Sequence, residues 1–249
     1  MRSPAGCASW RARPSRVGAR TLVVTGTDTG VGKTRIACEL IKLARGRRIK
    51  VCGFKPVATG CVPTPEGLRN DDALALQGAA GTSEPYEAIN PYAFEPAVAP
   101  HLAASSAGRT IRIAELDRVH AGLAQRYRLL VIEGAGGWHV PLDDAWTFGA
   151  WVAEREWPVV LVVGMRLGCL NHALLTAEAI ARETRLAGWV ANVLSPPMDR
   201  LEENIDSLAR RLSAPCWGVF PPDGTAFAAA GAVESSLDRL LAEAEEEVP

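Results

Sequence analysis

One stretch of the chain decides its fold: Gly26-Thr27-Asp28-Thr29-Gly30-Val31-Gly32-Lys33-Thr34. It lies between a short apolar run at residues 21–25 and a segment of helical periodicity at residues 33–45. In a turn of this kind, successive backbone N–H groups point inward and the following helix N-terminus adds positive potential, so the turn binds phosphate. Lys33 can reach the β- and γ-phosphates of a nucleotide, and Thr34 stands where the hydroxyl of such loops binds Mg²⁺.

The glycine spacing is a variant of the common phosphate-binding loop. The usual pattern has its first glycine at position 27, where this chain has Thr27, and the glycine stands at Gly26 instead. A glycine-rich turn can be only a tight connection, but Gly-Lys-Thr at a strand-to-helix junction favours the phosphate loop. The residues predicted to surround the phosphates are Thr29, Gly30, Val31, Gly32, Lys33 and Thr34.

Outward from this loop, short apolar runs alternate with amphipathic stretches, which is typical of a mostly parallel sheet covered by helices. The predicted strands are residues 21–25, 50–55, 129–133, 159–163, 187–192 and 216–220. The clearest helical stretches are residues 33–45, 71–77, 113–126, 170–184 and 200–212. We therefore expect a single α/β domain over residues 21–249, of the P-loop nucleotide-hydrolase type, with helices on both faces of the sheet.

Two segments depart from this alternation. Residues 56–107 are rich in proline and have little periodicity beyond 71–77, so we interpret them as a long connection of the kind that often carries function. Residues 1–20 contain five arginines and no acid. We interpret them as a disordered extension; an organellar presequence and a start codon placed too far upstream are the alternatives.

Composition excludes several classes of protein. Lys plus Arg number 27 against 28 for Asp plus Glu, so there is no global basic field to attract nucleic acid. No run approaches the roughly 18 apolar residues that a membrane span needs. The six cysteines are scattered without a C-x-x-C pair, which favours free thiols in a reducing cytoplasm. The four histidines have no spacing suited to a metal or a catalytic triad.

Three charged residues are candidates for the chemistry, and two of them end strands, where ligands of α/β sheets bind. Glu133 ends a buried run and precedes the glycine-rich residues 134–137, so it is a candidate Mg²⁺ carboxylate, with a helix cap or an ion pair as the alternative. Asp72 is a second candidate for the metal. Lys55 ends the second strand; it is either a solvated lysine or a second cation beside a γ-phosphate.

Together these segments resemble the dethiobiotin synthetase family over roughly residues 21–222. The matching motifs are VTGTDT (24–29), VGKT (31–34), KPVA (55–58), TPEGLRN (64–70), DALALQ (72–77), NPY (90–92), EGAGGW (133–138), LGC (167–169), NHA (171–173) and AGWVAN (187–192). The resemblance implies an enzyme of biotin biosynthesis that uses ATP and CO₂ to close the ureido ring on diaminopelargonate (7,8-diaminononanoate), through a carbamic-phosphoric anhydride. It also implies that Lys33 and Lys55 hold the transferring phosphate and the carbamate.

The resemblance assigns further residues. Thr34, Asp72 and Glu133 would hold Mg²⁺. The nucleotide and substrate contacts that it implies are Gly134, Ala135 and Gly136 beside ATP, Asn192 and Pro221 at the adenine, and Thr59 and Gly136 at the diamine. It further implies a homodimer with a shared site, in which Gly168 and Asn171 bind the substrate carboxylate of the partner chain.

Some positions depart from the family pattern. Gly30 and Val193 stand where an acid is common, and the residues after Pro221 diverge, which leaves the preference for ATP, CTP or GTP open. The alternative function is a partitioning-type nucleotide-switch ATPase on the same type of fold. Such proteins have an additional lysine early in the loop, where this chain has Asp28 and Thr29.

Overall fold

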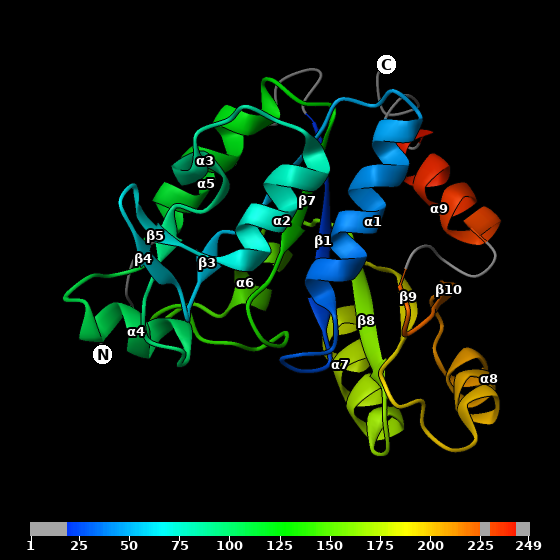
Figure 1. Cartoon of the computed structure of the whole chain (residues 1–249). Coiled ribbons are helices and arrows are strands. Elements are labelled where there is room, and N and C mark those ends of the chain that lie inside the picture. The colour runs from blue at the N-terminus through cyan, green and yellow to red at the C-terminus, as the bar shows by residue number, and fades with distance from the viewer. Residues whose placement is uncertain (1–18, 225–229, 243–249) are drawn as a thin grey trace, which may run out of the picture.

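Six parallel strands form the centre of the fold in a computed structural model, which describes residues 19–224 and 230–242 (Figure 1). They are β1 (Arg20–Gly26), β2 (Val51–Phe54), β7 (Leu129–Glu133), β8 (Val159–Met165), β9 (Leu186–Val193) and β10 (Cys216–Phe220). Their order across the sheet is β10-β9-β8-β1-β7-β2, and every neighbouring pair is parallel. All six carboxyl ends therefore meet at one edge of the sheet.

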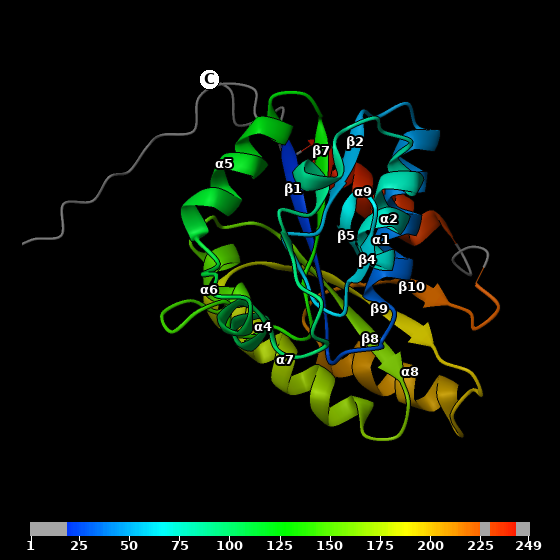
Figure 2. The same ribbon diagram turned by 60° about the vertical axis from the view of Figure 1, so that its left-hand side comes forward.

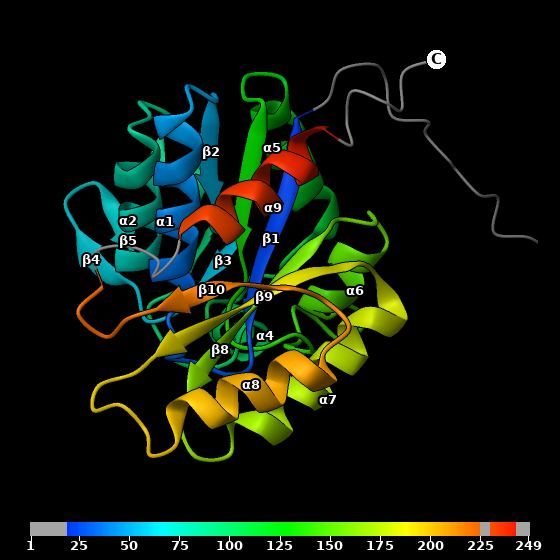
Figure 3. The ribbon, with the colours of Figure 1, turned by 90° about the vertical axis from the view of Figure 1, so that its right-hand side faces the viewer.

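Helices cover both faces because strand side chains alternate between the faces. In β1, Leu22 and Val24 face one layer, while Val23 faces the other. The first layer contains α1 (Lys33–Gly46), α2 (Asp71–Ala80) and α9 (Ala230–Ala242). The second contains α5 (Ile113–Ala124), α6 (Phe148–Ala153), α7 (Cys169–Glu183) and α8 (Leu201–Arg211). Figures 2 and 3 show the two layers on opposite sides of the sheet. The predicted single α/β domain with helices on both faces is confirmed.

Every strand and helix expected from periodicity is present, with ends displaced by a few residues. The expected extension lies outside the described residues as far as residue 18, and its last residue, Arg20, already belongs to β1. Outside residues 56–107, two of the described helices had not been predicted. The six-residue α6 is too short to show a period. The helix α9 could have been found, because Val233, Leu237 and Leu240 recur at helical spacing and lie on one buried face.

The interpretation of residues 56–107 as one long connection was wrong. Besides α2, the segment forms β3 (Val57–Ala58), β4 (Val62–Thr64), β5 (Gly67–Arg69), α3 (Tyr86–Ile89), β6 (Tyr92–Ala93) and α4 (Pro100–Ser106). Its prolines stand where proline is tolerated. Pro85 caps α3, Pro100 is the first residue of α4, and Pro63 lies in the exposed two-stranded β4–β5 pair. Elements of two to seven residues leave no period to detect.

Cysteine and membrane features were also expected from composition. The cysteines at positions 38, 52, 61, 169 and 216 are free thiols, and Cys7 lies outside the described residues. Within the part of the chain that the structure describes, no helix has the length and apolar character to cross a membrane.

His120 joins α5 to the start of the central strand. Its Nε2 lies 2.8 Å from Thr21 Oγ1, and its ring lies 4.4 Å from the ring of Trp157. Burial lowers the pKa of His120 to about 4, an effect that the charge of Asp117 only partly opposes. The folded protein therefore keeps this imidazole neutral at pH values where an unfolded histidine, with a pKa near 6.5, is protonated.

We predict that His120→Gln makes the protein less sensitive to acid. Between about pH 6.5 and 4 the unfolded state binds a proton that the folded state does not, so this histidine lowers the free energy of unfolding as the pH falls through that window. Urea unfolding of both proteins at pH 7.5 and pH 5 measures the effect. The exposed His139, changed to Gln, is the control. An equal loss of stability on acidification in wild-type and His120→Gln would contradict the prediction.

Candidate functional site

A cavity of about 480 Å³ opens at the carboxyl edge of the sheet, where β1, β2 and β7 end. Most of the predicted site residues line it: Thr29, Gly30, Gly32, Lys33, Thr34, Lys55, Thr59, Asp72, Glu133, Ala135 and Gly136. Arg35, Ala58 and Asn70 line it as well and had not been predicted. Segments from residue 29 to residue 136 therefore converge on one site, as expected of a parallel sheet.

The phosphate loop has the backbone that its glycines allow. Gly30 and Gly32 have φ of 74° and 91°, the left-handed region that favours glycine, and α1 begins directly after Gly32. A Cβ at Gly26 would lie 2.5 Å from Val31 Cγ2, so the displaced glycine makes room for the buried Val31 side chain. The loop closes on its own lysine, because Lys33 Nζ donates to the Asp28 carbonyl oxygen at 2.9 Å.

Lys55 and two carboxylates form a charge cluster at the bottom of the cavity, in which Lys55 and Glu133 are buried and Asp72 is partly exposed. Lys55 Nζ donates to Glu133 Oε1 at 2.6 Å and to Asp72 Oδ2 at 2.9 Å. Thr34 Oγ1 lies 2.7 Å from both Asp72 Oδ1 and Glu133 Oε1. Lys55 is only 3% exposed and Glu133 is fully buried. The interpretation of Lys55 as a solvated lysine is therefore excluded.

The pKa directions in this cluster follow from burial and mutual charge. Burial raises the pKa of Glu133, and Lys55 only partly offsets that effect. Burial opposes the charge on Lys55 too, but the charges of Glu133 and Asp72 together raise its pKa. Burial, reinforced by the charge of Lys55, lowers the pKa of Lys33 to about 8. Two ammonium groups thus lie close enough together to repel each other, as expected where anions bind.

The same cluster fits a magnesium ion by its donor chemistry. Glu133 Oε2 is buried and accepts no hydrogen bond, and the nearby Asp72 and Thr34 present hard oxygens. Mg²⁺ prefers such oxygens and usually takes one or two carboxylates, with phosphate and water completing its coordination. Among the described residues there is no group of three or more His, Cys, Asp or Glu side chains that could hold a metal. Binding would therefore need phosphate oxygens as well.

Neighbouring residues hold the cluster in place. Asn70 caps α2 by accepting from the backbone N–H groups of Asp72 and Ala73, which fixes Asp72 in the first helical turn. Asn90 Nδ2 donates to the Lys55 carbonyl oxygen at 2.7 Å. Asn70 could have been found from the sequence, since asparagine before Asp71-Asp72 is a helix-start signal. Nothing local in the sequence places Asn90 against Lys55, because 35 positions separate them.

Asn192 and Pro221 do not line the cavity, although both were expected at the adenine. Asn192 is 1% exposed, and its Nδ2 donates to the Val31 carbonyl oxygen at 2.8 Å. Its Oδ1 is buried without a partner. The Pro221 carbonyl oxygen accepts from Arg35 Nη2 at 2.8 Å. Both residues therefore lie against the phosphate loop and the start of α1, and their contact with a base stays a prediction.

Val31 and Gly134 contribute through packing. Val31 is buried beneath the loop, and Gly134 lies under Phe148, where a Cβ would be 2.7 Å from the ring. Gly168 and Asn171 stand apart from the cavity, at the start of α7. Asn171 is exposed, and the neighbouring Leu167 is 94% exposed. Their predicted role at a partner's substrate stays a prediction.

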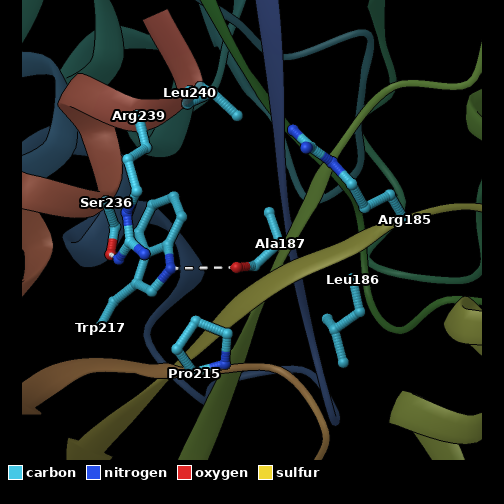
Figure 4. Close-up of a pocket in the computed structure, with 8 residues that line it drawn as sticks. All are labelled: Arg185, Leu186, Ala187, Pro215, Trp217, Ser236, Arg239 and Leu240. Carbon is cyan, nitrogen blue, oxygen red and sulfur yellow. Dashed lines mark hydrogen bonds between the residues drawn. The ribbon is translucent and has the colours of Figure 1, made fainter. Parts of the chain in front are cut away.

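Two other cavities lie at the opposite edge of the sheet. One of about 170 Å³ is shown in Figure 4, and its lining is Arg185, Leu186, Ala187, Pro215, Trp217, Ser236, Arg239 and Leu240. Another of about 590 Å³ lies near the start of β2, between Arg45 and Tyr127. The first has no carboxylate, imidazole or thiol in its lining, and neither lies at the carboxyl ends of the strands. The reactive groups gather in the cavity beside the phosphate loop.

Trp138 anchors the glycine-rich residues 134–137, two of which line the cavity. The Trp138 indole is buried, and its Nε1 donates to Glu183 Oε2 of α7 at 2.9 Å. The Trp138 carbonyl oxygen accepts from Gly149 N at 2.9 Å. A Cβ at Gly149 would lie 2.6 Å from the indole ring, so only glycine lets α6 approach this closely. This packing fixes one wall of the site.

Comparison with known proteins gives close relatives. A family model described as an AAA domain matches residues 20–226. The ATP-dependent dethiobiotin synthetase BioD of Pseudomonas paraeruginosa is 52% identical over 217 residues, covering 86% of this chain and 94% of the relative. The protein of the same name from Cellvibrio japonicus is 48% identical over 223 residues, covering 89% of this chain and 98% of the relative.

Solved structures resemble the chain in fold alone. The MinD cell division protein of Aquifex aeolicus superposes with a TM-score of 0.53 at 15% identity, covering 93% of this chain and 99% of MinD. A ParA family ATPase from Chlorobium tepidum has a TM-score of 0.50 at 16% identity, with 92% of each chain covered. The P-loop type of fold expected from residues 26–34 is confirmed by these likenesses.

We predict opposite effects of two glycine-to-alanine changes. Gly149→Ala forces the new Cβ against the rigid Trp138 ring and should lower the free energy of unfolding by about 1–3 kcal/mol. Gly78→Ala, at an exposed position of α2 with no atom within 4 Å of the new Cβ, should raise it by about 0.5–1 kcal/mol. Urea unfolding at pH 7.5 measures both. An unchanged stability of Gly149→Ala would show that Trp138 does not pack as described.

Proposed function

The chain belongs to the dethiobiotin synthetase family, and on this premise we propose that it joins CO₂ to diaminopelargonate and closes the ureido ring of dethiobiotin. As a member it is an ATP-dependent ligase. The observation that carries the proposal is the buried Lys55, held between Glu133 and Asp72 beside the phosphate loop. Binding of a nucleotide alone would not require this second ammonium.

The proposed reaction needs charge neutralisation at three points. One amine of the diamine adds to CO₂ and loses a proton to solvent, which gives a carbamate. A carbamate oxygen attacks the γ-phosphorus, and the bond from that phosphorus to ADP breaks. The second amine then attacks the carbamoyl carbon and loses a proton to solvent, the bond from that carbon to the phosphate oxygen breaks, and the ring closes as phosphate leaves. Each step develops or moves negative charge on oxygen, which positioned cations stabilise.

Lys33 and Lys55 are the cations that we assign to the stabilisation of this negative charge. Lys33 already turns its ammonium inward at Asp28, within the loop that would hold the phosphates. Lys55 is positioned rigidly, since its ammonium is bonded to two carboxylates and its carbonyl oxygen to Asn90. Electrostatic stabilisation is stronger in such a buried setting than in water. We assign to these lysines the transferring phosphate and the carbamate.

We assign Mg²⁺ to Thr34, Asp72 and Glu133, whose oxygens converge. When bound, the ion would neutralise phosphate charge as a Lewis acid. Asp72 and Glu133 in addition hold the Lys55 ammonium. The unpartnered Oε2 of Glu133 supports the assignment, because a buried carboxylate oxygen without a partner is costly.

On the substrate side, Thr59 and Gly136 line the cavity and are assigned to the diamine. Gly168 and Asn171 lie outside the cavity, so in the proposed homodimer they bind the substrate carboxylate of the partner chain. The exposed Leu167 beside them supports a contact surface there. A cytoplasmic location, expected from the scattered cysteines, belongs to the same proposal.

A partitioning-type ATPase remains the alternative to test, because MinD and ParA proteins have the same type of fold. We predict that the protein releases phosphate from ATP only when diaminopelargonate and bicarbonate are both present. Coupled phosphate-release assays with each substrate omitted in turn measure this dependence. Equal ATP turnover without the diamine would refute the synthetase and favour the switch protein.

We predict that Lys55→Gln separates binding from chemistry. The glutamine amide can still donate to Glu133, so ATP affinity should change by no more than a few-fold. Ring closure should fall by about 100-fold or more, as when one oxyanion donor is removed. Calorimetric ATP binding and dethiobiotin formation are the measurements, with thermal unfolding as a check on folding. Full activity in a folded Lys55→Gln would refute the role of Lys55.

A further inference from the structure

Arg35 connects the phosphate loop to the segment that follows β10. It is the residue after Thr34 in α1, and its Nη2 donates to the carbonyl oxygens of Pro221 and Pro222 at 2.8 and 3.0 Å. Its guanidinium carbon lies 4.5 Å from the centre of the Phe220 ring. A single cation thus stacks on one residue of the segment and binds the next two.

The segment also closes around Arg35 from its far end. Gly224 has φ of 59°, and a Cβ at this position would overlap with the Arg35 guanidinium. The backbone at Gly224 therefore lies directly against the guanidinium, in a conformation that glycine adopts without strain. We call residues 220–224 the Arg35 loop.

The order of strands places the Arg35 loop on one side of the phosphate loop and the charge cluster on the other. Lys55 and Glu133 follow or end β2 and β7, whereas the Arg35 loop follows β10, at the opposite end of the sheet from β2 (Figure 3). A nucleoside triphosphate whose γ-phosphate lies at Lys55 must direct its sugar and base away from the cluster. The base therefore points toward the ends of β9 and β10.

The Arg35 loop has a neighbour suited to a base. Asn192 pairs with Phe220 in the sheet register, and its buried Oδ1 has no partner. Arg35 itself lines the cavity next to Thr34. The Arg35 loop therefore begins at the strand residue that pairs with Asn192.

We propose that Arg35 is a positioning residue that sets the preference for the nucleotide base by holding the Arg35 loop in shape. The proposal rests on the ATP-dependent function proposed above. Arg35 acts through the loop, because its Nη2 donates to two backbone carbonyl oxygens of the loop and its guanidinium stacks on the Phe220 ring.

The test compares Arg35→Ala with the unchanged full-length protein. Equilibrium binding of the Mg²⁺ complexes of ATP, CTP and GTP is measured by calorimetry, and ring closure by steady-state kinetics. Loss of hydrogen bonds from a charged donor should weaken binding of the preferred nucleotide about tenfold and that of the others less. The three dissociation constants should therefore become more nearly equal. The kcat at saturating nucleotide should stay within about twofold of the unchanged protein's value, because the charge cluster is untouched.

Two further variants separate the effect of the loop's shape from the effect of the guanidinium charge. Gly224→Ala keeps the guanidinium but prevents the loop from closing on it. It should therefore reduce the differences among the three dissociation constants in the same way. Arg45→Ala is the matched control. Arg45 lies on the same helix, donates to the Ala79 carbonyl oxygen at 2.8 Å and packs against Gly81, which also has a positive φ, but it lies away from the nucleotide cavity. Arg45→Ala should leave the ratios of the three dissociation constants unchanged.

The outcomes distinguish this inference from the proposed function. An equal loss of affinity for all three nucleotides in Arg35→Ala would identify a phosphate contact and overturn the inference, as would unchanged ratios in both Arg35→Ala and Gly224→Ala. Either result leaves ATP-dependent ring closure standing. Failure of the unchanged protein to bind any nucleotide would overturn the proposed function and the inference with it.

Discussion

The ammonium of Lys55, bonded to the carboxylates of Glu133 and Asp72, is the interaction on which the site depends. Glu133 ends the fully buried β7, and a carboxylate there is tolerated only because a cation and the Thr34 hydroxyl meet it. Removing either partner from such a pair leaves an uncompensated buried charge, which costs more than the intact pair contributes. The cluster therefore ties β2, α2, β7 and the start of α1 to one geometry.

Around that cluster, glycine residues shape the walls of the cavity. The phosphate loop relies on the positive φ of Gly30 and Gly32, and its displaced Gly26 accommodates the buried Val31. On the other wall, Gly149 lets α6 approach the Trp138 indole closely enough to fix the glycine-rich residues 134–137. Both walls are thus set by close packing against glycine, which allows little adjustment to a bulkier residue.

The two ends of the nucleotide cavity are built differently. At one end, the Lys55 ammonium is bonded to the carboxylates of Asp72 and Glu133. The proposed reaction requires oxygen anions to be neutralised at this end. At the other end, the Arg35 guanidinium holds two backbone carbonyl groups and stacks on an aromatic ring. The strand order separates these ends across the sheet. In the proposed enzyme, reactivity and base preference would therefore depend on different residues.

The sequence by itself determined what depends on local pattern: buried apolar runs, helix periods, and the Gly-Lys-Thr turn that joins the first strand to the first helix. Those features predicted the α/β class, the loop, and Glu133 and Asp72 as metal candidates, and the motif resemblance gave Lys55 its role. The short elements within residues 56–107 escaped because two to seven residues show no period. Only the tertiary structure decided which atoms pair. Arg35 and Pro221 are 186 positions apart and Thr34 and Glu133 are 99 apart, and contacts over such separations leave no trace in local sequence.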